Sequence, residues 1–453
     1  MIRKHRLSLS TTQVILLGFL ITILVGSMLL SLPVSSADGK AVPYVDALFT
    51  ATTATCVTGL VTVPTYSTWS SFGQAIILVL IQIGGLGIIT ILTGLMIMLN
   101  KKIGIGDRLL IQDAFNLNTM SGLVAFVKRV LFGTFLIEGI GAILYMLVFV
   151  PEFGMKGIWI SVFNAISAFC NAGMDVIGDS SLCDYAANPL INIVTSALII
   201  MGGIGYIVWW DVLRVVKSRT SQNRKIFRHL TLHSKIAIVS TLVLLIGGAV
   251  LVLIFDYHNP LTIGEMSFPN KLLASFFQSV TTRTAGFATI PQEHLTNASA
   301  FVSLLLMFIG GSPVGTAGGV KTVTMAVLVC SAVASIRNRE DTVLFGRSIS
   351  RRSISKAVAV TVTSFAIMFT STILLAAVTD VASLDILYET VSAAATVGLS
   401  RNLTSSLNLA GKIVIIITMY LGRVGPISLA VALGSKKESQ NIVKNPTEEI
   451  SIG

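Results

Sequence analysis

Four glycine residues recur along the chain at an almost constant spacing, and together they could build a site for a metal cation. Gly59, Gly173, Gly286 and Gly398 are separated by 114, 113 and 112 residues. Each follows an aromatic residue by ten positions and precedes an apolar residue. Glycine permits backbone angles that turn carbonyl oxygens toward a ligand, and such oxygens can replace the hydration shell of a cation. The candidate ligand residues are Val57, Thr58 and Gly59; Asn171, Ala172 and Gly173; Thr284, Ala285 and Gly286; and Thr396, Val397 and Gly398.

The chemistry of these four glycine turns favours a weakly held monovalent ion. None of them contains a carboxylate, the ligand that calcium prefers. A single glycine in an apolar stretch is more often a helix-packing residue. Four glycines in matching positions at one period favour a shared function instead.

A second glycine-rich stretch, residues 310–322, predicts a movable segment. It holds five glycines, a proline and a lysine inside an otherwise apolar span. Because glycine and proline cost about 1 and 3 kcal/mol in a helix interior, we expect the helix to break there. We interpret residues 310–322, here called the gate loop, as a segment that can open and close an ion path. The alternative is a kink that is packed within the helix bundle. A phosphate-binding loop is excluded, since that motif needs glycine directly before lysine. The candidate gate residues are Gly310, Gly311, Ser312, Pro313, Gly315, Gly318, Gly319, Lys321 and Arg423.

Three charged residues stand at unusual places in this apolar chain. Arg423 lies in the last apolar segment, where a charge is costly and normally faces a cavity or a partner. We expect it to form an electrostatic barrier or to donate hydrogen bonds to carbonyls of the gate loop, and snorkelling to the interface is the alternative. Arg283 is expected to bond backbone or an outer acid such as Asp175 or Glu389. Glu138 is expected to be paired inside the helix bundle.

The elements that must position these residues are membrane helices. Hydrophobic residues make up 53% of the 453 residues and charged residues only 12%, about half the charge of a soluble domain. A spanning helix needs about 20 apolar residues. Eight candidate spans lie near 12–32, 70–99, 124–150, 188–213, 233–256, 299–334, 354–379 and 409–433.

Between the two spans of each pair lies a shorter apolar stretch that ends at one of the four glycines. The sequence therefore predicts an all-α membrane protein with four tandem helix–re-entrant pore helix–helix repeats around a central pore. The dipole of each short helix would place partial negative charge at its C-terminal end, in mid-membrane. The predicted units are repeat 1 (8–100), repeat 2 (120–217), repeat 3 (230–337, with the gate loop), repeat 4 (352–435) and a C-terminal tail (436–453).

The basic residues predict the orientation. With both termini in the cytoplasm, 24 of the 32 lysines and arginines fall in the inner segments and six on the outer side. This bias is the positive-inside rule. The net charge of +11 is thus a topology signal, and nucleic-acid binding is not expected.

The motifs resemble the membrane subunit of the Ktr/Trk/HKT potassium transporter superfamily, from residue 8 to 435. The resemblance rests on the segments 56–60 (CVTGL), 282–287 (TRTAGF) and 310–322 (GGSPVGTAGGVKT). With no extra helix pair before the first repeat, the chain is similar to the KtrB type. The resemblance implies potassium uptake, sodium as a second cation, a homodimer with one pore per protomer, and a cytosolic ring of nucleotide-binding RCK subunits of the KtrA type.

We therefore predict a potassium uptake protein of the cell membrane, in contact with lipid and binding no nucleotide itself. The alternative is a sodium-coupled cation carrier with alternating access, which should carry ionisable residues at its centre; only Arg423 and Glu138 qualify. An enzyme is not expected, because no His, Asp or Glu cluster lies at membrane depth. His229 and His233 are one helical turn apart, but no third metal ligand is near.

Overall fold

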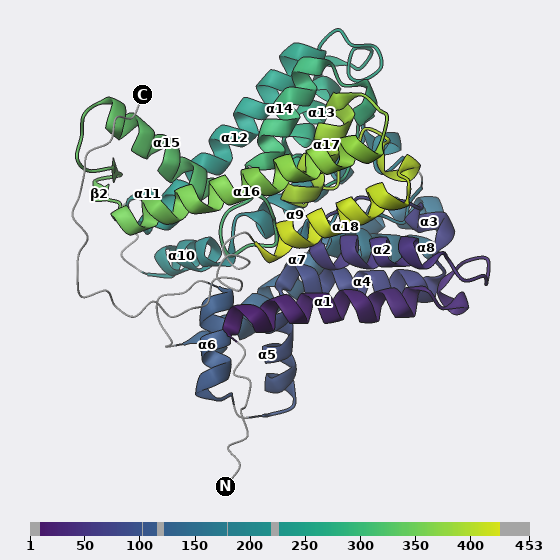
Figure 1. Ribbon diagram of the computed structural model, residues 1–453, viewed down its shortest axis with the longest axis horizontal. Coiled ribbons are helices and arrows are strands. Elements are labelled where there is room, and N and C mark those ends of the chain that lie inside the picture. Colours follow the sequence, from purple (N-terminus) through teal and green to yellow (C-terminus); the bar gives the residue numbers. More distant parts are fainter. Residues whose placement is uncertain (1–9, 102, 116–121, 179, 219–225, 426–453) are drawn as a thin grey trace.

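A computed structural model describes residues 10–425 apart from residues 102, 116–121, 179 and 219–225. Within these ranges the chain is almost entirely helical (Figure 1). Four helices are long and apolar enough to cross a membrane, and at most a third of their most apolar stretch is buried in the protein. They are α1 (Thr11–Leu30), α7 (Leu123–Phe153), α12 (Leu232–Asp256) and α16 (Arg351–Val378).

Each long helix is followed by a short helix that is much more deeply buried. Ten of the 13 residues of α2 are buried, so the short helices lie at the centre and the long ones outside. A returning helix then follows in every case. The short helices are α2 (Tyr44–Cys56), α8 (Lys156–Cys170), α13 (Phe268–Thr281) and α17 (Ser383–Ala395). The returning helices are α4 (Ser71–Leu86), α9 (Pro189–Gly203), α14 (Asn297–Phe308) and α18 (Leu409–Val424).

The returning segments are not the continuous spans expected over 70–99 and 188–213. Helices α4 and α5 (Ile88–Met98) meet at Gly87 with a bend of 101°. Helices α9 and α10 (Tyr206–Lys217) meet at Gly205 with a bend of 95°. Both glycines have positive φ, 84° and 94°, which a helix cannot accommodate and which other residues rarely adopt. Among the residues that the structure describes, the gate loop is thus one of three breaks in the returning segments.

The third break is the widest, because residues 309–321 separate α14 from α15 (Thr322–Ile336). The expectation that the helix breaks in this region is confirmed. In the fourth returning segment, α18 is helical up to Val424, and the rest of the expected span to residue 433 lies outside the described residues.

The remaining elements are short connectors. In Figure 1, α5, α6, α10, α11 and α15 gather at the end of the bundle where α1 and α16 begin. A two-stranded antiparallel hairpin joins α15 to α16. The connectors are η1 (Pro33–Ser35), α3 (Thr65–Thr68), α6 (Ile105–Ala114), η2 (Cys183–Tyr185), α11 (Ile226–His229), η4 (Gln292–His294), β1 (Val343–Leu344), β2 (Arg347–Ser348) and η5 (Thr404–Ser406).

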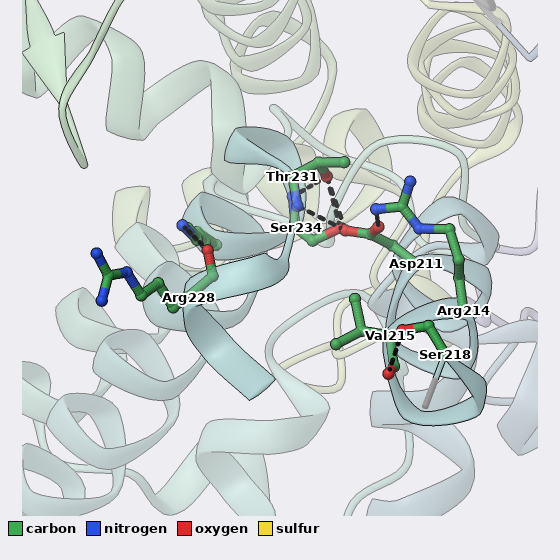
Figure 2. A network of polar contacts seen from close by, with 8 residues as sticks. Asp211, Arg214, Val215, Ser218, Arg228, Thr231 and Ser234 are labelled. Atoms are coloured by element: carbon green, nitrogen blue, oxygen red, sulfur yellow. Dashed lines mark hydrogen bonds and ion pairs between the residues drawn. The ribbon is translucent and has the colours of Figure 1, made fainter. Parts of the chain in front are cut away.

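Helix α10 is attached to the beginning of α12 through one carboxylate (Figure 2). Asp211 Oδ2 accepts hydrogen bonds from the backbone N–H and the hydroxyl of Thr231, both at 2.8 Å. Its Oδ1 lies 2.5 Å from Arg214 Nη2. Thr231 is the N-cap of α12, and its hydroxyl oxygen accepts from the Ser234 N–H. The bent arm after Gly205 is therefore held against the next long helix.

Polar contacts join the outer ends of the four helical units in chain order. Each contact links one unit to the next, and the last links the fourth to the first. They are Trp159 Nε1 to Gln74 Oε1 (2.8 Å), Leu182 N–H to Ala288 O (2.9 Å), Arg401 Nη1 to Gln292 O (3.0 Å) and Lys412 Nζ to Asp46 Oδ1 (2.6 Å). The units consequently close into a ring.

Candidate functional site

The four glycine turns share one unusual backbone conformation. The glycines all have positive φ, between 65° and 99°. Two residues before each glycine stands a non-glycine residue that is also left-handed. A left-handed backbone conformation is a genuine outlier for a β-branched residue. The backbone strain that it causes is found most often at functional sites. The four residues are Val57 (φ 55°), Asn171 (59°), Thr284 (67°) and Thr396 (52°).

Paired backbone hydrogen bonds at the end of each short helix hold this conformation. In the first turn, Thr58 N–H donates to Thr53 O at 2.8 Å and Val57 N–H donates to Ala54 O at 3.2 Å. This is a Schellman helix end, which normally places glycine at the left-handed position. The second and fourth turns repeat both bonds. The third differs, because the right-handed conformation continues through Thr282 and Ala285 N–H donates to Thr281 O.

A buried hydroxyl supports each turn, and the sequence analysis missed it. In three units a threonine or serine stands six residues before the glycine, whereas the third unit has Val280 there and Thr281 one position later. Alignment of the four units could have revealed this position. The bonds are Gly59 N–H to Thr53 Oγ1 (2.9 Å), Ser167 Oγ to Met174 O (2.5 Å), Thr281 Oγ1 to Phe287 O (2.6 Å) and Gly398 N–H to Ser392 Oγ (3.0 Å).

The structure brings the four turns together around one axis. A Cβ atom built on Gly59 would lie 2.5 Å from Ala172 O, and one on Gly286 would lie 2.6 Å from Val397 O. Built on Gly173 or Gly398, it would collide with the carbonyl oxygen of Ala285 or Thr58. Each glycine thus faces the carbonyl that precedes the glycine of the next unit, and the fourth faces the first. No side chain fits at these positions.

The surroundings of this ring favour positive charge. All four glycines line one cavity of about 510 Å³, here called the outer cavity after the predicted orientation, together with the carboxylate residues Asp175 and Glu293. The C-terminal ends of the short helices point at the ring and add partial negative charge. On the cavity wall, burial raises the pKa of the Cys183 thiol to about 12, and the nearby carboxylates of Glu293, Asp184 and Asp175 add smaller shifts in the same direction.

The gate loop lies directly against the bend between α9 and α10. Three backbone hydrogen bonds join them: Ser312 N–H to Gly203 O at 2.8 Å, Thr316 N–H to Gly202 O at 3.1 Å, and Tyr206 N–H to Val314 O at 2.9 Å. The two ends of the loop are joined as well, because Gly310 N–H donates to Val320 O at 3.0 Å. The Gly202–Gly205 cluster therefore serves as the seat of the loop.

Both basic gate residues donate to loop carbonyls. Arg423 Nη1 donates to Thr316 O at 2.7 Å, the type of bond predicted for it, and Nη2 donates to Gly84 O in the first returning helix. Lys321 Nζ donates to Ala317 O at 2.5 Å. Arg423 thus ties the loop to α4 of the first unit at Gly84. Its predicted snorkelling alternative is wrong, since the guanidinium group is bonded inside the protein.

The other charged residues have partners that were only partly predicted. Arg283 Nη2 donates to the carbonyl of Gly310 at 3.3 Å, so the predicted backbone bond is confirmed. Glu389, one of the alternative partners, is a buried carboxylate that accepts hydrogen bonds from Ser400 Oγ, at 2.7 Å, and from Thr404 Oγ1. Glu138 is paired inside the bundle as expected, with Gln82 Nε2 3.2 Å from both of its oxygens.

In the part of the chain that the structure describes, His, Cys, Asp and Glu form no group that could hold a metal ion.

Known proteins are similar to this chain along nearly its whole length. The family model described as TrkH, cation transport protein, matches residues 7–445. The chain is 40% identical to the Ktr system potassium uptake protein B of Bacillus subtilis over 442 residues, 97% of this chain and 96% of that protein. It is also 40% identical to the potassium/sodium uptake protein NtpJ of Enterococcus hirae, over 100% of this chain and 99% of that protein. The fold matches the crystal structure of the potassium transporter TrkH from Vibrio parahaemolyticus with a TM-score of 0.73 and 17% identity, over 96% of this chain and 87% of that one.

Proposed function

The chain belongs to the TrkH family of cation transport proteins, and from this membership we propose that it takes up potassium ions through the ring of four glycine turns. It is a multi-pass membrane protein of a transporter family and not an enzyme. The observation that carries the proposal is the ring itself, in which carbonyl oxygens of the four units approach one axis. A ring of carbonyls without carboxylates suits a monovalent cation, and the names of two relatives specify potassium or potassium with sodium.

In this proposal, four repeats surround one pore in each protomer of a homodimer, with both chain termini in the cytoplasm. The gate loop closes the pore below the ring, and a cytosolic ring of RCK subunits controls it. The support is the position of the loop, which contacts the residues of the glycine turns from one side while the outer cavity lies on the other. The relative that is named for a Ktr system supports the assignment of the regulator.

Uptake of radioactive rubidium into liposomes tests the function. The purified chain is reconstituted, and an inside-negative voltage drives uptake. We expect uptake that excess external potassium abolishes, that sodium inhibits much less, and that needs no sodium gradient. Liposomes without protein give the background. Uptake that strictly requires a sodium gradient would replace this proposal with the sodium-coupled carrier, and the absence of cation flux would refute both.

The basic segment after α15 gives a prediction about the regulator. Reversing the charges of the exposed residues Arg337, Arg339 and Arg347 to glutamate should abolish co-purification with the RCK subunit, because a surface with an excess of basic charge attracts a partner of opposite charge. The measurement is the amount of co-expressed subunit retained on the tagged membrane protein at moderate salt. Charge reversal at the exposed outer residues Lys40 and Lys156 is the matched control. Undiminished association of the triple variant would show that these charges only orient the chain in the membrane.

A further inference from the structure

Two residues of the glycine turns also contact the gate loop through their side chains. The hydroxyl oxygen of Thr284 accepts a hydrogen bond from Gly318 N–H at 3.1 Å. The amide oxygen of Asn171 lies 2.9 Å from the Thr316 hydroxyl, which also lies 3.0 Å from Phe169 O. All of the side chains in these contacts are shielded from solvent: Asn171 is 1% exposed, and Thr284 and Thr316 are 0% exposed.

The loop is fitted closely to the third and fourth turns. A Cβ atom at Gly318 would collide with the hydroxyl oxygen of Thr396, which is the residue equivalent to Thr284 in the fourth unit. The Thr396 hydroxyl has no hydrogen-bond partner among the described residues. Gly318 is therefore the residue that allows the loop to pass between Thr284 and Thr396 and to present its N–H to Thr284.

The first unit lacks this polar group. The residue equivalent to Asn171 and Thr284 is Val57, whose φ of 55° is close to theirs. An apolar β-branched side chain can thus occupy this left-handed position in this same protein. The polar character of Asn171 and Thr284 is consequently not needed to form a turn, and it requires another explanation.

We propose that Asn171 and Thr284, here called the latch pair, hold the gate loop closed with their side chains while their backbones belong to the glycine turns. This rests on the proposed function, because it names the residues that set how strongly the loop closes the pore. The hydrogen bonds from the latch pair to the gate loop are shielded from water. If one of them is lost while the loop remains in place, no water molecule can replace the missing partner. Withdrawal of the loop must break both contacts, so the latch pair couples loop position to the second and third turns.

The test replaces each of the two polar side chains with valine. Asn171→Val introduces the residue that the first unit already uses, and Thr284→Val removes only the hydroxyl. We expect each variant to raise rubidium uptake without the regulator on the order of fivefold, the factor for one net hydrogen bond. Thr316→Val removes the contact to Asn171 and also the bond to Phe169 O. Combining it with Asn171→Val should therefore add nothing to the effect of Thr316→Val alone. Thr361→Val in α16 is the matched control and should leave uptake unchanged, because the Thr361 hydroxyl has no hydrogen-bond partner in the described part of the chain.

A second measurement does not depend on transport. Hydrogen exchange of the peptide that covers residues 310–322, measured by mass spectrometry on the purified chain in lipid nanodiscs, should be faster in both latch variants and unchanged in Thr361→Val. If wild-type protein carries no rubidium but exchange still rises, the proposed function fails while the latch contacts stand. Unchanged exchange in both latch variants, or additive effects of Asn171→Val and Thr316→Val on exchange, would overturn the proposal.

Discussion

Replacement of Gly398 with serine is expected to lower the preference for potassium over sodium by about tenfold or more. A tenfold loss corresponds to about 1.4 kcal/mol, which lies within the roughly 1–3 kcal/mol that a strained backbone residue costs. Gly398 has a φ of 97°, and a Cβ atom there would collide with Thr58 O and lie 2.8 Å from Gly59 Cα. The serine must therefore displace a carbonyl of the first turn. Sodium competition of rubidium uptake measures the change.

A glycine outside the ring separates this effect from a general loss of folding. Gly247 lies on the exposed side of α12, and a Cβ atom there would meet nothing within 4 Å. Gly247→Ser should leave both the uptake rate and the ion preference unchanged. The serine variants of Gly59, Gly173 and Gly286 should resemble Gly398→Ser. An unaltered preference in all four ring variants would remove the glycine turns from the selectivity filter.

Deletion of residues 312–318 is expected to raise unregulated uptake by one to two orders of magnitude. It removes the loop's backbone bonds to Gly202, Gly203 and Tyr206, together with both latch contacts. Two net hydrogen bonds already correspond to about 2 kcal/mol, or roughly a 30-fold shift toward the open state. Uptake with and without the RCK subunit is the measurement, and its dependence on the subunit should fall.

Arg423→Ala should act in the same direction as the deletion, because Arg423 donates to Thr316 O within the deleted segment. In the deletion background the additional change should have little effect on closure, which distinguishes a role in holding the loop from a purely electrostatic barrier. Monodisperse elution in detergent would establish that each variant is folded. Normal or reduced uptake by a folded deletion variant would make the loop a structural kink and place the gate elsewhere.

The features predictable from the sequence are those that recur with a fixed spacing. The glycine turns could be located because one pattern occurs four times at a nearly constant spacing, which chance does not explain. Gly59 and its three equivalents all have positive φ, as expected for such turns. The bond from Arg423 to the gate loop was predictable for a different reason. A charge at membrane depth needs a partner, and a broken helix offers free carbonyls.

Contacts made by backbone alone could not be predicted. The seat of the loop on Gly202 and Gly203 uses only N–H and carbonyl groups, so no side chain marks it. The bends at Gly87 and Gly205 were missed because glycine is also tolerated inside membrane helices, and composition does not separate the two cases. The partner of Glu138 was missed because Gln82 is neutral and lies 56 residues earlier in the chain.

The bend at Gly205 gives α10 the properties of a lever arm. Its first residue, Tyr206, holds Val314 of the gate loop through a backbone hydrogen bond, and its 12 residues reach about 18 Å from there to Lys217. At that length, a displacement of about 3 Å at Lys217 corresponds to a rotation of α10 by roughly 10° about Gly205. Asp211 ties the middle of the arm to Thr231, so α10 cannot swing unless the start of α12 moves with it or the tie breaks. A force applied at the end of α10 therefore reaches the loop through main-chain atoms. Substitutions of side chains on the exposed side of α10 do not alter this backbone connection.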